Sequence, residues 1–146
     1  MRDIANIIAS ATNPILAAIL LIAIFVRRRP RPWGFLLACA AGVGIAVELA
    51  EVGKDVLLYP DPHGFPSGHE TFAAAVLTCL VWLDRRWLLP AIPVAVVMGV
   101  ALVLAQYHAP IDVVGAAFLG PIPPSLILLT LRRPERPPAS GSAGSQ

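Results

Sequence analysis

The chain has 146 residues, of which 57% are hydrophobic and 14% are charged. A soluble domain of this length cannot bury so much apolar surface in one core, so the composition excludes an ordinary soluble protein. The formal net charge of +2 is small, and the basic residues cluster beside apolar stretches, so no nucleic-acid partner is expected.

Five apolar stretches are long enough, or nearly long enough, for a membrane-spanning helix, which takes about 20 residues. Their apolar residues are continuous rather than alternating, which favours helices over barrel strands. We therefore predict an all-α integral membrane bundle over residues 1–131, followed by a disordered cytoplasmic tail over residues 132–146 that is rich in Pro, Ser and Gly. The five expected transmembrane helices are residues 4–26, 33–53, 67–83, 87–107 and 111–131.

Proline and glycine positions modify three of these helices. Asn13-Pro14 predicts a kink or a broken turn in the first helix. Gly42 and Gly44 are expected to let the second helix approach a neighbour closely. Three prolines in the last stretch predict that it is bent or partly unwound: Pro121, Pro123 and Pro124. We expect the first stretch to be a span rather than a cleaved signal peptide, because its flanking charges cancel and no clear cleavage site follows it.

Basic residues are distributed unevenly among the connections. Of the eleven Lys and Arg residues, nine follow the first, third and fifth stretches. With five spans these connections lie on one side of the membrane, and the positive-inside rule assigns that side to the cytoplasm. We predict a multi-pass cell-membrane protein whose N-terminus is outside and whose C-terminus is cytoplasmic. The abundance of Ala, Arg and Pro favours a bacterial inner membrane.

Two cysteines, Cys39 and Cys79, fall inside predicted spans. We expect both to be small buried residues rather than a disulfide or a metal pair.

A polar motif, Phe65-Pro66-Ser67-Gly68-His69-Glu70, opens the third stretch. Ser67 and Glu70 have the spacing of a capping box, in which Ser67 caps the helix and Glu70 bonds back to the Ser67 amide. Free amides at a helix N-terminus also bind anions, and Gly68 lets an anion approach the backbone. His69, in the first turn, could then protonate a leaving group. The two interpretations are compatible.

A second motif, His108-Ala109-Pro110-Ile111-Asp112, opens the fifth stretch. Asp112 could accept a hydrogen bond from one ring nitrogen of His108, which leaves the other nitrogen as a nucleophile or base. The alternative is a surface histidine followed by a carboxylate that favours the helix dipole. With five spans, both motifs lie at the outer face.

These residues resemble the type 2 phosphatidic acid phosphatase family of membrane lipid phosphatases. Pro66-Ser67-Gly68-His69 matches the central motif of that family, and His108 with Asp112 matches the end of its last motif. Lys54 and Pro62 match the opening lysine and the closing proline of the first motif. The resemblance covers about residues 33–131 and implies a helical bundle that hydrolyses lipid phosphate esters or anhydrides without a metal or other cofactor.

The resemblance also implies roles for individual residues. His108 would attack phosphorus and form a phosphohistidine, Asp112 would orient His108, and His69 would protonate the leaving oxygen. Lys54, Ser67 and the Gly68 amide would hold phosphate oxygens.

Two phosphate-binding arginines of the family are absent. Asp61 stands where the first motif has one arginine, and Ala101 and Leu102 stand where the last motif has Ser-Arg. Arginine is the preferred bidentate phosphate ligand, so the site loses positive charge. An arginine from a neighbouring subunit could replace it if the protein forms an oligomer.

A divalent cation is the alternative source of positive charge. No tight ligand spacing is present, so no metal residue is assigned. Glu51 could serve this outer region or simply pair with Lys54 at i, i+3. The candidate donors are Asp61, His63, His69, Glu70, His108 and Asp112.

Three functions therefore stay open at the level of sequence. The first is a lipid phosphatase acting on phosphatidate-type lipids or polyprenyl phosphates and diphosphates within the bilayer. The second is a non-catalytic member of the fold that binds a lipid headgroup or a partner. The third is a metal-assisted hydrolase that uses the acidic outer residues.

Overall fold

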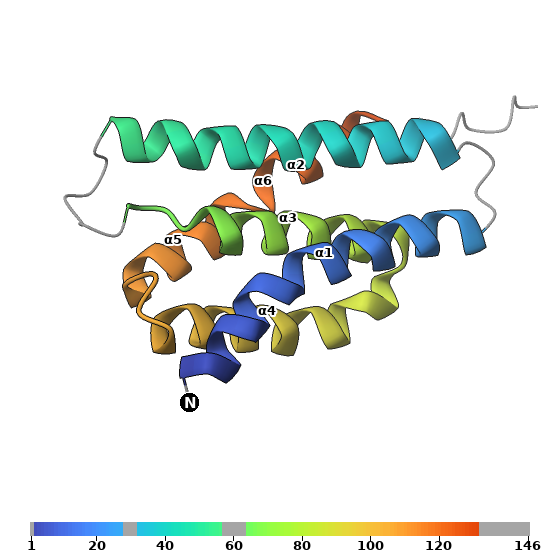
Figure 1. The fold of residues 1–146 in the computed structure, drawn as a ribbon. Helices are drawn as coiled ribbons and strands as arrows, with labels where there is room; N and C mark the ends of the chain where they lie inside the picture. The colour runs from blue at the N-terminus through green and yellow to red at the C-terminus, as the bar shows by residue number, and fades with distance from the viewer. Residues whose placement is uncertain (1, 28–31, 57–63, 132–146) are drawn as a thin grey trace, which may run out of the picture.

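The computed structural model describes residues 2–27, 32–56 and 64–131 (Figure 1). These residues form helices and contain no strand, so the all-α prediction is confirmed for them. The tail predicted over residues 132–146 lies outside the described residues. The elements are α1 (Arg2–Val26), α2 (Pro32–Asp55), α3 (Gly68–Leu83), the 3-10 turn η1 (Arg85–Trp87), α4 (Leu88–Leu104), α5 (Pro110–Leu119) and α6 (Ile122–Thr130).

Four of the five predicted spans are long and apolar enough to cross a membrane: Asp3–Val26, Pro32–Asp55, Arg85–Leu104 and Pro110–Thr130. The fourth ends at Leu104 rather than at Tyr107, because the chain leaves the helix in a turn where Gln106 has a φ of 60°. The third, α3, has 16 residues, so at 1.5 Å per residue it is about 24 Å long and shorter than the bilayer core.

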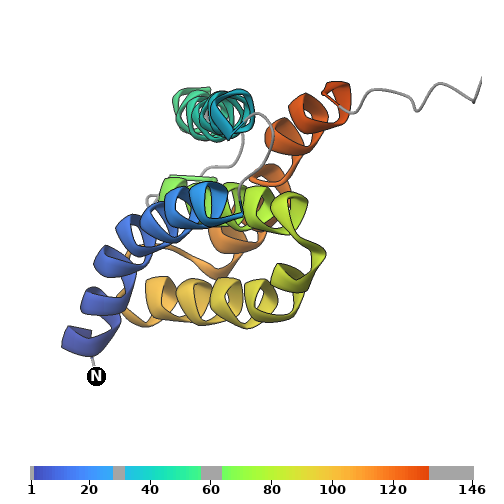
Figure 2. The same cartoon turned by 90° about the vertical axis from the view of Figure 1, so that its right-hand side faces the viewer.

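The short helix α3 is the centre of the bundle. It packs against α1, α2, α4, α5 and α6 (Figures 1 and 2). Its buried side chains include Ala73, Ala75, Cys79 and Leu80, whereas the surrounding helices expose many large aliphatic side chains. Small residues inside the bundle and large aliphatic residues on its surface suit a lipid environment, where tight packing of small residues holds helices together. Cys39 and Cys79 are free and buried, as predicted.

One of the two predicted glycine contacts is confirmed. A Cβ atom on Gly42 would lie 2.5 Å from Pro124 Cα, so α2 and α6 can be this close only with glycine at that position. A Cβ atom on Gly44 would meet nothing within 4 Å, so the prediction for Gly44 is wrong.

The prolines act differently in the first and last spans. Pro14 lies inside α1, which stays one continuous helix from Arg2 to Val26 rather than breaking. The last span is divided into α5 and α6, as the proline cluster predicts, and the two helices run in different directions (Figure 1). Proline lacks an amide donor, so the hydrogen-bond ladder of the span is interrupted here.

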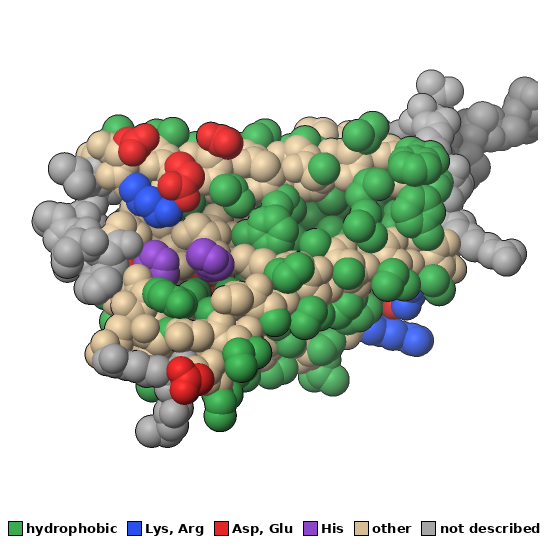
Figure 3. Space-filling model, viewed as in Figure 1, with side chains coloured by type: hydrophobic (Ala, Val, Ile, Leu, Met, Phe, Trp, Pro, Cys, Tyr) green, Lys and Arg blue, Asp and Glu red, His purple; other side chains and the backbone are tan. Residues whose placement is uncertain are grey.

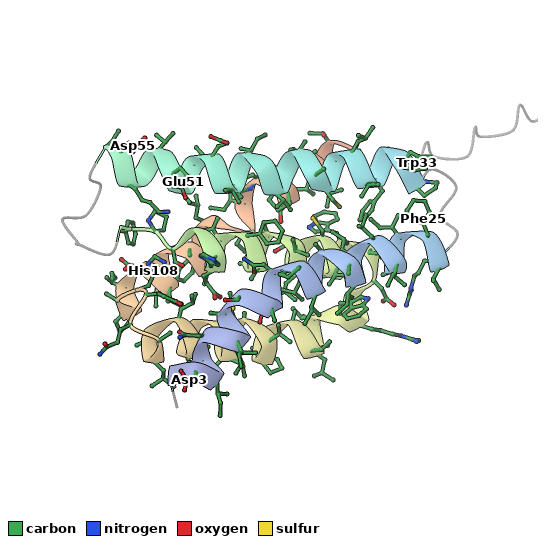
Figure 4. The ribbon with its side chains drawn as sticks, viewed as in Figure 1. Asp3, Phe25, Trp33, Glu51, Asp55 and His108 are labelled. Atoms are coloured by element: carbon green, nitrogen blue, oxygen red, sulfur yellow. The ribbon has the colours of Figure 1, made fainter. Side chains whose placement is uncertain are left out.

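The two ends of the bundle differ in character. At one end the Arg27 guanidinium pairs with the Asp84 carboxylate, and the rings of Phe25 and Trp33 pack edge to face 5.3 Å apart. His108 lies at the other end (Figure 4). The turn after α1 and the turn after α3 therefore share one end, as five spans require. The assignment of this end to the cytoplasm remains a prediction from the positive-inside rule.

Candidate active site

Two helix N-termini are joined at the end of the bundle that carries His108. The Ser67 amide donates a hydrogen bond to the Asp112 carbonyl oxygen, with a distance of 3.1 Å. Ser67 precedes α3 and Asp112 lies in the first turn of α5, so this bond holds the two sequence motifs beside each other. The resulting arrangement brings together residues that are about 40 positions apart in the chain.

Ser67 caps α3, but the reciprocal half of the predicted capping box is wrong. The Ser67 Oγ atom accepts from the Glu70 amide at 3.4 Å, and its carbonyl oxygen accepts from Thr71 Oγ1 at 2.8 Å. The Glu70 carboxyl group does not bond back, because the Ser67 amide is used by Asp112. Ser67 is fully buried and shapes the turn that presents Gly68 and His69.

A cavity of about 370 Å³ opens between α1, α2 and α3. Figure 3 shows the two described histidines side by side, next to the lysine and acidic side chains of α2. The cavity therefore combines both sequence motifs with the candidate lysine. Its walls are Asn13, Pro14 and Ala17 of α1, Val47, Glu51 and Lys54 of α2, Gly68, His69 and Phe72 of α3, and His108.

His108 stands in the turn between α4 and α5, and Asp112 lies behind it. The His108 Nδ1 atom is 3.5 Å from Asp112 Oδ2, within ion-pair distance of a protonated ring, but it makes no hydrogen bond with the described residues. Asp112 is fully buried, and its Oδ2 atom also accepts from the Ala109 amide at 2.9 Å. The carboxylate is thus held by the start of α5 and faces Nδ1, which leaves Nε2 as the second ring nitrogen.

Burial lowers the pKa of the His108 imidazole below its usual value of 6.5. Asp112 opposes this shift, and the nearby Lys54 and His69 add to it. The net direction favours a neutral ring at neutral pH, which is the form that can act as a nucleophile.

Titration of His108 should therefore have its midpoint below 6.5. The chain has three histidines, so ring NMR of the detergent-solubilised protein can be assigned with single His→Ala variants. In Asp112→Asn the midpoint should fall further, because the carboxylate that favours the imidazolium is gone. A midpoint above 6.5 in the unmodified protein would contradict this expectation.

Lys54 is paired with Glu51, as the i, i+3 spacing predicts. The Lys54 Nζ atom lies 2.6 Å from Glu51 Oε1. A Cβ atom on Gly68 would come within 3.0 Å of this oxygen and 3.4 Å of Nζ, so glycine lets the ion pair touch the first turn of α3. The lysine charge is therefore present at the site but partly neutralised.

Asn13 is a site residue that the sequence analysis treated only as part of a kink. Its Nδ2 atom donates to the His69 carbonyl oxygen at 3.3 Å, and its Oδ1 atom is buried without a hydrogen-bond partner. A polar side chain in the middle of an apolar span was the signal that could have identified it, because such residues usually serve a site.

Several predicted residues do not join the cavity. Glu70 is buried on another side of α3, and Asp61 and His63 lie outside the described residues. Ala101 and Leu102, at the positions of the family's Ser-Arg pair, are buried in α4. Within residues 2–27, 32–56 and 64–131, no group of three His, Cys, Asp or Glu side chains could hold a metal ion.

The comparison with known proteins identifies a family for the chain. A family model described as the PAP2 superfamily matches residues 14–123, which include Lys54, His69, His108 and Asp112. No curated protein and no solved structure matches the chain significantly. The family match covers most of the chain and both histidine motifs, so this protein belongs to the PAP2 superfamily, whose activity is of the phosphatase type.

Proposed function

We propose that the protein is a membrane lipid phosphatase that uses His108 as its nucleophile. The observation that carries the proposal is that two histidines from separate motifs line one cavity, with Asp112 behind His108 and Lys54 of α2 in the cavity wall. Apolar walls at Ala17, Val47 and Phe72 adjoin these polar groups. A molecule with a phosphate head and an apolar tail fits both parts of the cavity.

The reaction follows from the positions of the two rings. His108 Nε2 attacks phosphorus as the bond from phosphorus to the leaving oxygen breaks, and His69 gives that oxygen a proton. The lipid leaves as an alcohol, or as a monophosphate when the substrate is a diphosphate. His69, now neutral, then takes a proton from water, whose oxygen attacks phosphorus and releases inorganic phosphate and His108.

Phosphate oxygens are held by the first turn of α3 and by Lys54. The first amides of a helix have no intrahelical partner, so those of Gly68 and His69 face the place where an anion would sit. Ser67 serves this arrangement indirectly, since its hydroxyl group caps the helix rather than lining the cavity.

The substrates we propose are phosphatidate-type lipids and polyprenyl phosphates or diphosphates, with catalysis on the non-cytoplasmic side of a bacterial inner membrane. The first experiment measures phosphate release by the detergent-solubilised protein from phosphatidate and undecaprenyl diphosphate, with and without a chelator. Release that survives the chelator supports the histidine mechanism. Release that requires an added divalent cation would favour a metal-assisted hydrolase instead.

A non-catalytic role in binding a lipid headgroup is the second candidate. The observation in its favour is the weak positive charge of the cavity, since Lys54 is paired with Glu51 and Leu102 occupies the position of a missing arginine. A preorganised positive charge, such as the missing arginine would supply, typically stabilises the transition state by a few kcal/mol. Absence of phosphate release from either lipid, with or without metal, would favour this candidate.

Removing the negative charge of Glu51 should strengthen phosphate binding. In Glu51→Gln the KM for a lipid phosphate should fall by about tenfold at low ionic strength, and less at high salt, because Lys54 no longer shares its charge with a carboxylate. Glu48→Gln is the matched control, since it makes the same change in net charge on the same helix but lies outside the cavity. An unchanged or higher KM in Glu51→Gln would mean that the carboxylate positions Lys54.

A further inference from the structure

Glu70 is a buried acid that the phosphate site does not use. Its side chain is 1% exposed, and neither carboxyl oxygen has a hydrogen-bond partner among the described residues. Burying a carboxyl group without a partner is costly, and acids inside membrane bundles usually serve a ligand or a pathway. The carboxyl group therefore needs a hydrogen-bond partner that the described residues do not supply.

The Glu70 side chain lines an apolar groove between α4 and α5. The groove has a volume of about 460 Å³, and Glu70 supplies its acidic group. A Cβ atom on Gly99 would lie 2.6 Å from Val113 Cγ1 and 3.8 Å from Glu70 Oε2, so the carboxyl group lies beside Gly99, where α4 and α5 meet. Val96, Val100 and Val114 form exposed parts of the walls.

This groove is separate from the phosphate cavity. No residue lines both of them. His69 and Glu70 are neighbours in α3, and consecutive helical residues point about 100° apart, so one faces α1 and α2 while the other faces α4 and α5. Any ligand of the groove can therefore bind while the phosphate cavity is empty.

The side chains that line the groove determine which class of ligand it can bind. No cation lies among its lining residues, and a charged pair in apolar surroundings bears a large desolvation cost. A neutral carboxyl group offers one donor and one acceptor, which is the same pair of functions that a hydroxyl group offers in return. The apolar walls suit a hydrocarbon chain.

We propose that the groove between α4 and α5 binds a long-chain alcohol, with its hydroxyl group on the Glu70 carboxyl group and its chain along the two helices. The lipid alcohol released by the hydrolysis proposed above is one such molecule. That identification rests on the proposed function, whereas the binding of an alcohol does not.

The test uses the purified full-length protein in detergent and a dodecanol that carries a photoreactive diazirine on its chain. Cross-linking to peptides of α4 and α5 is measured against probe concentration and compared with the same chain lacking the hydroxyl group. The alcohol should bind about tenfold more tightly than the hydrocarbon, which corresponds to one buried hydrogen bond. The tighter binding of the alcohol should persist in His108→Ala. The result can therefore be interpreted even if the phosphatase proposal fails.

Two variants of similar size separate the chemical alternatives. Glu70→Gln keeps a donor and an acceptor and should retain the preference for the alcohol, whereas Glu70→Leu should bind both probes equally. Glu70→Leu should also raise the Tm, because it removes an unpartnered polar group, and this shows that the variant folds. Equal binding of the two probes by the unmodified protein, or a Glu70→Gln variant that behaves like Glu70→Leu, would overturn the proposal.

Discussion

Phosphate release from a lipid phosphate is expected to fall by about a thousandfold or more when His108 is replaced with alanine, as it does when other enzymes lose a nucleophile. The reason is that the side chain supplies the atom that bonds to phosphorus, and among the described residues His108 is the one imidazole besides His69 that lines the cavity. The measurement is inorganic phosphate released per protein at saturating substrate, with thermal unfolding recorded for both proteins.

His69→Ala is the matched comparison, because both rings line the same cavity. If His69 only protonates the leaving oxygen, an activated leaving group should make that proton unnecessary. With p-nitrophenyl phosphate, His69→Ala should therefore recover much of the rate at which His108 attacks phosphorus. The same substrate should not restore His108→Ala. Equal rescue of both variants, or substantial turnover by His108→Ala, would assign the nucleophile to another group.

Asp112→Asn is expected to lower kcat by about a hundredfold to ten-thousandfold, as in enzymes where a carboxylate orients a catalytic histidine. Binding of the lipid phosphate should change little. Asparagine keeps an oxygen that can accept from the Ala109 amide, so the start of α5 is preserved while the charge facing His108 Nδ1 is lost. The measurement is kcat beside the Kd of a non-hydrolysable phosphonate analogue.

A second substitution at this position separates orientation from support of the fold. Asp112→Ala also removes the acceptor for the Ala109 amide, so it should lose about 1 kcal/mol of stability in addition to activity. Asp112→Asn should keep its thermal stability and shift the titration of His108 to lower pH. Equal losses of kcat and binding in Asp112→Asn would count against an orienting role.

Charge is the feature that separates this site from the arginine-containing pattern it resembles. The cavity contains Lys54, and Glu51 shares its charge at 2.6 Å. Leu102, at the position of one missing arginine, is buried in α4. Removing the negative charge of Glu51 is a direct way to compensate for the positive charge that the missing arginines would supply. The Glu51→Gln variant is therefore informative for the whole phosphatase proposal.

Much of the site could be predicted from local pattern because its parts lie in short motifs at helix starts. Ser67 caps α3, Asp112 lies next to His108, and Lys54 pairs with Glu51, and each of these contacts spans at most four residues. Contacts at i, i+3 and i, i+4 follow from helix geometry itself, so sequence spacing is enough to predict them. Asn13 was missed because its partner, the His69 carbonyl oxygen, lies on another helix.

Continuous apolar stretches and helix-start residues act locally, so the helical membrane bundle and the two histidine motifs could be predicted without coordinates. The face that each motif residue presents depends instead on how the helices pack against one another. Glu70 has the spacing of a capping box, yet the Ser67 amide bonds to Asp112, and the carboxyl group faces α4 and α5 instead. The physical reason is competition for partners: a backbone amide satisfies one strong hydrogen bond, and which acceptor it takes depends on the helices packed around it.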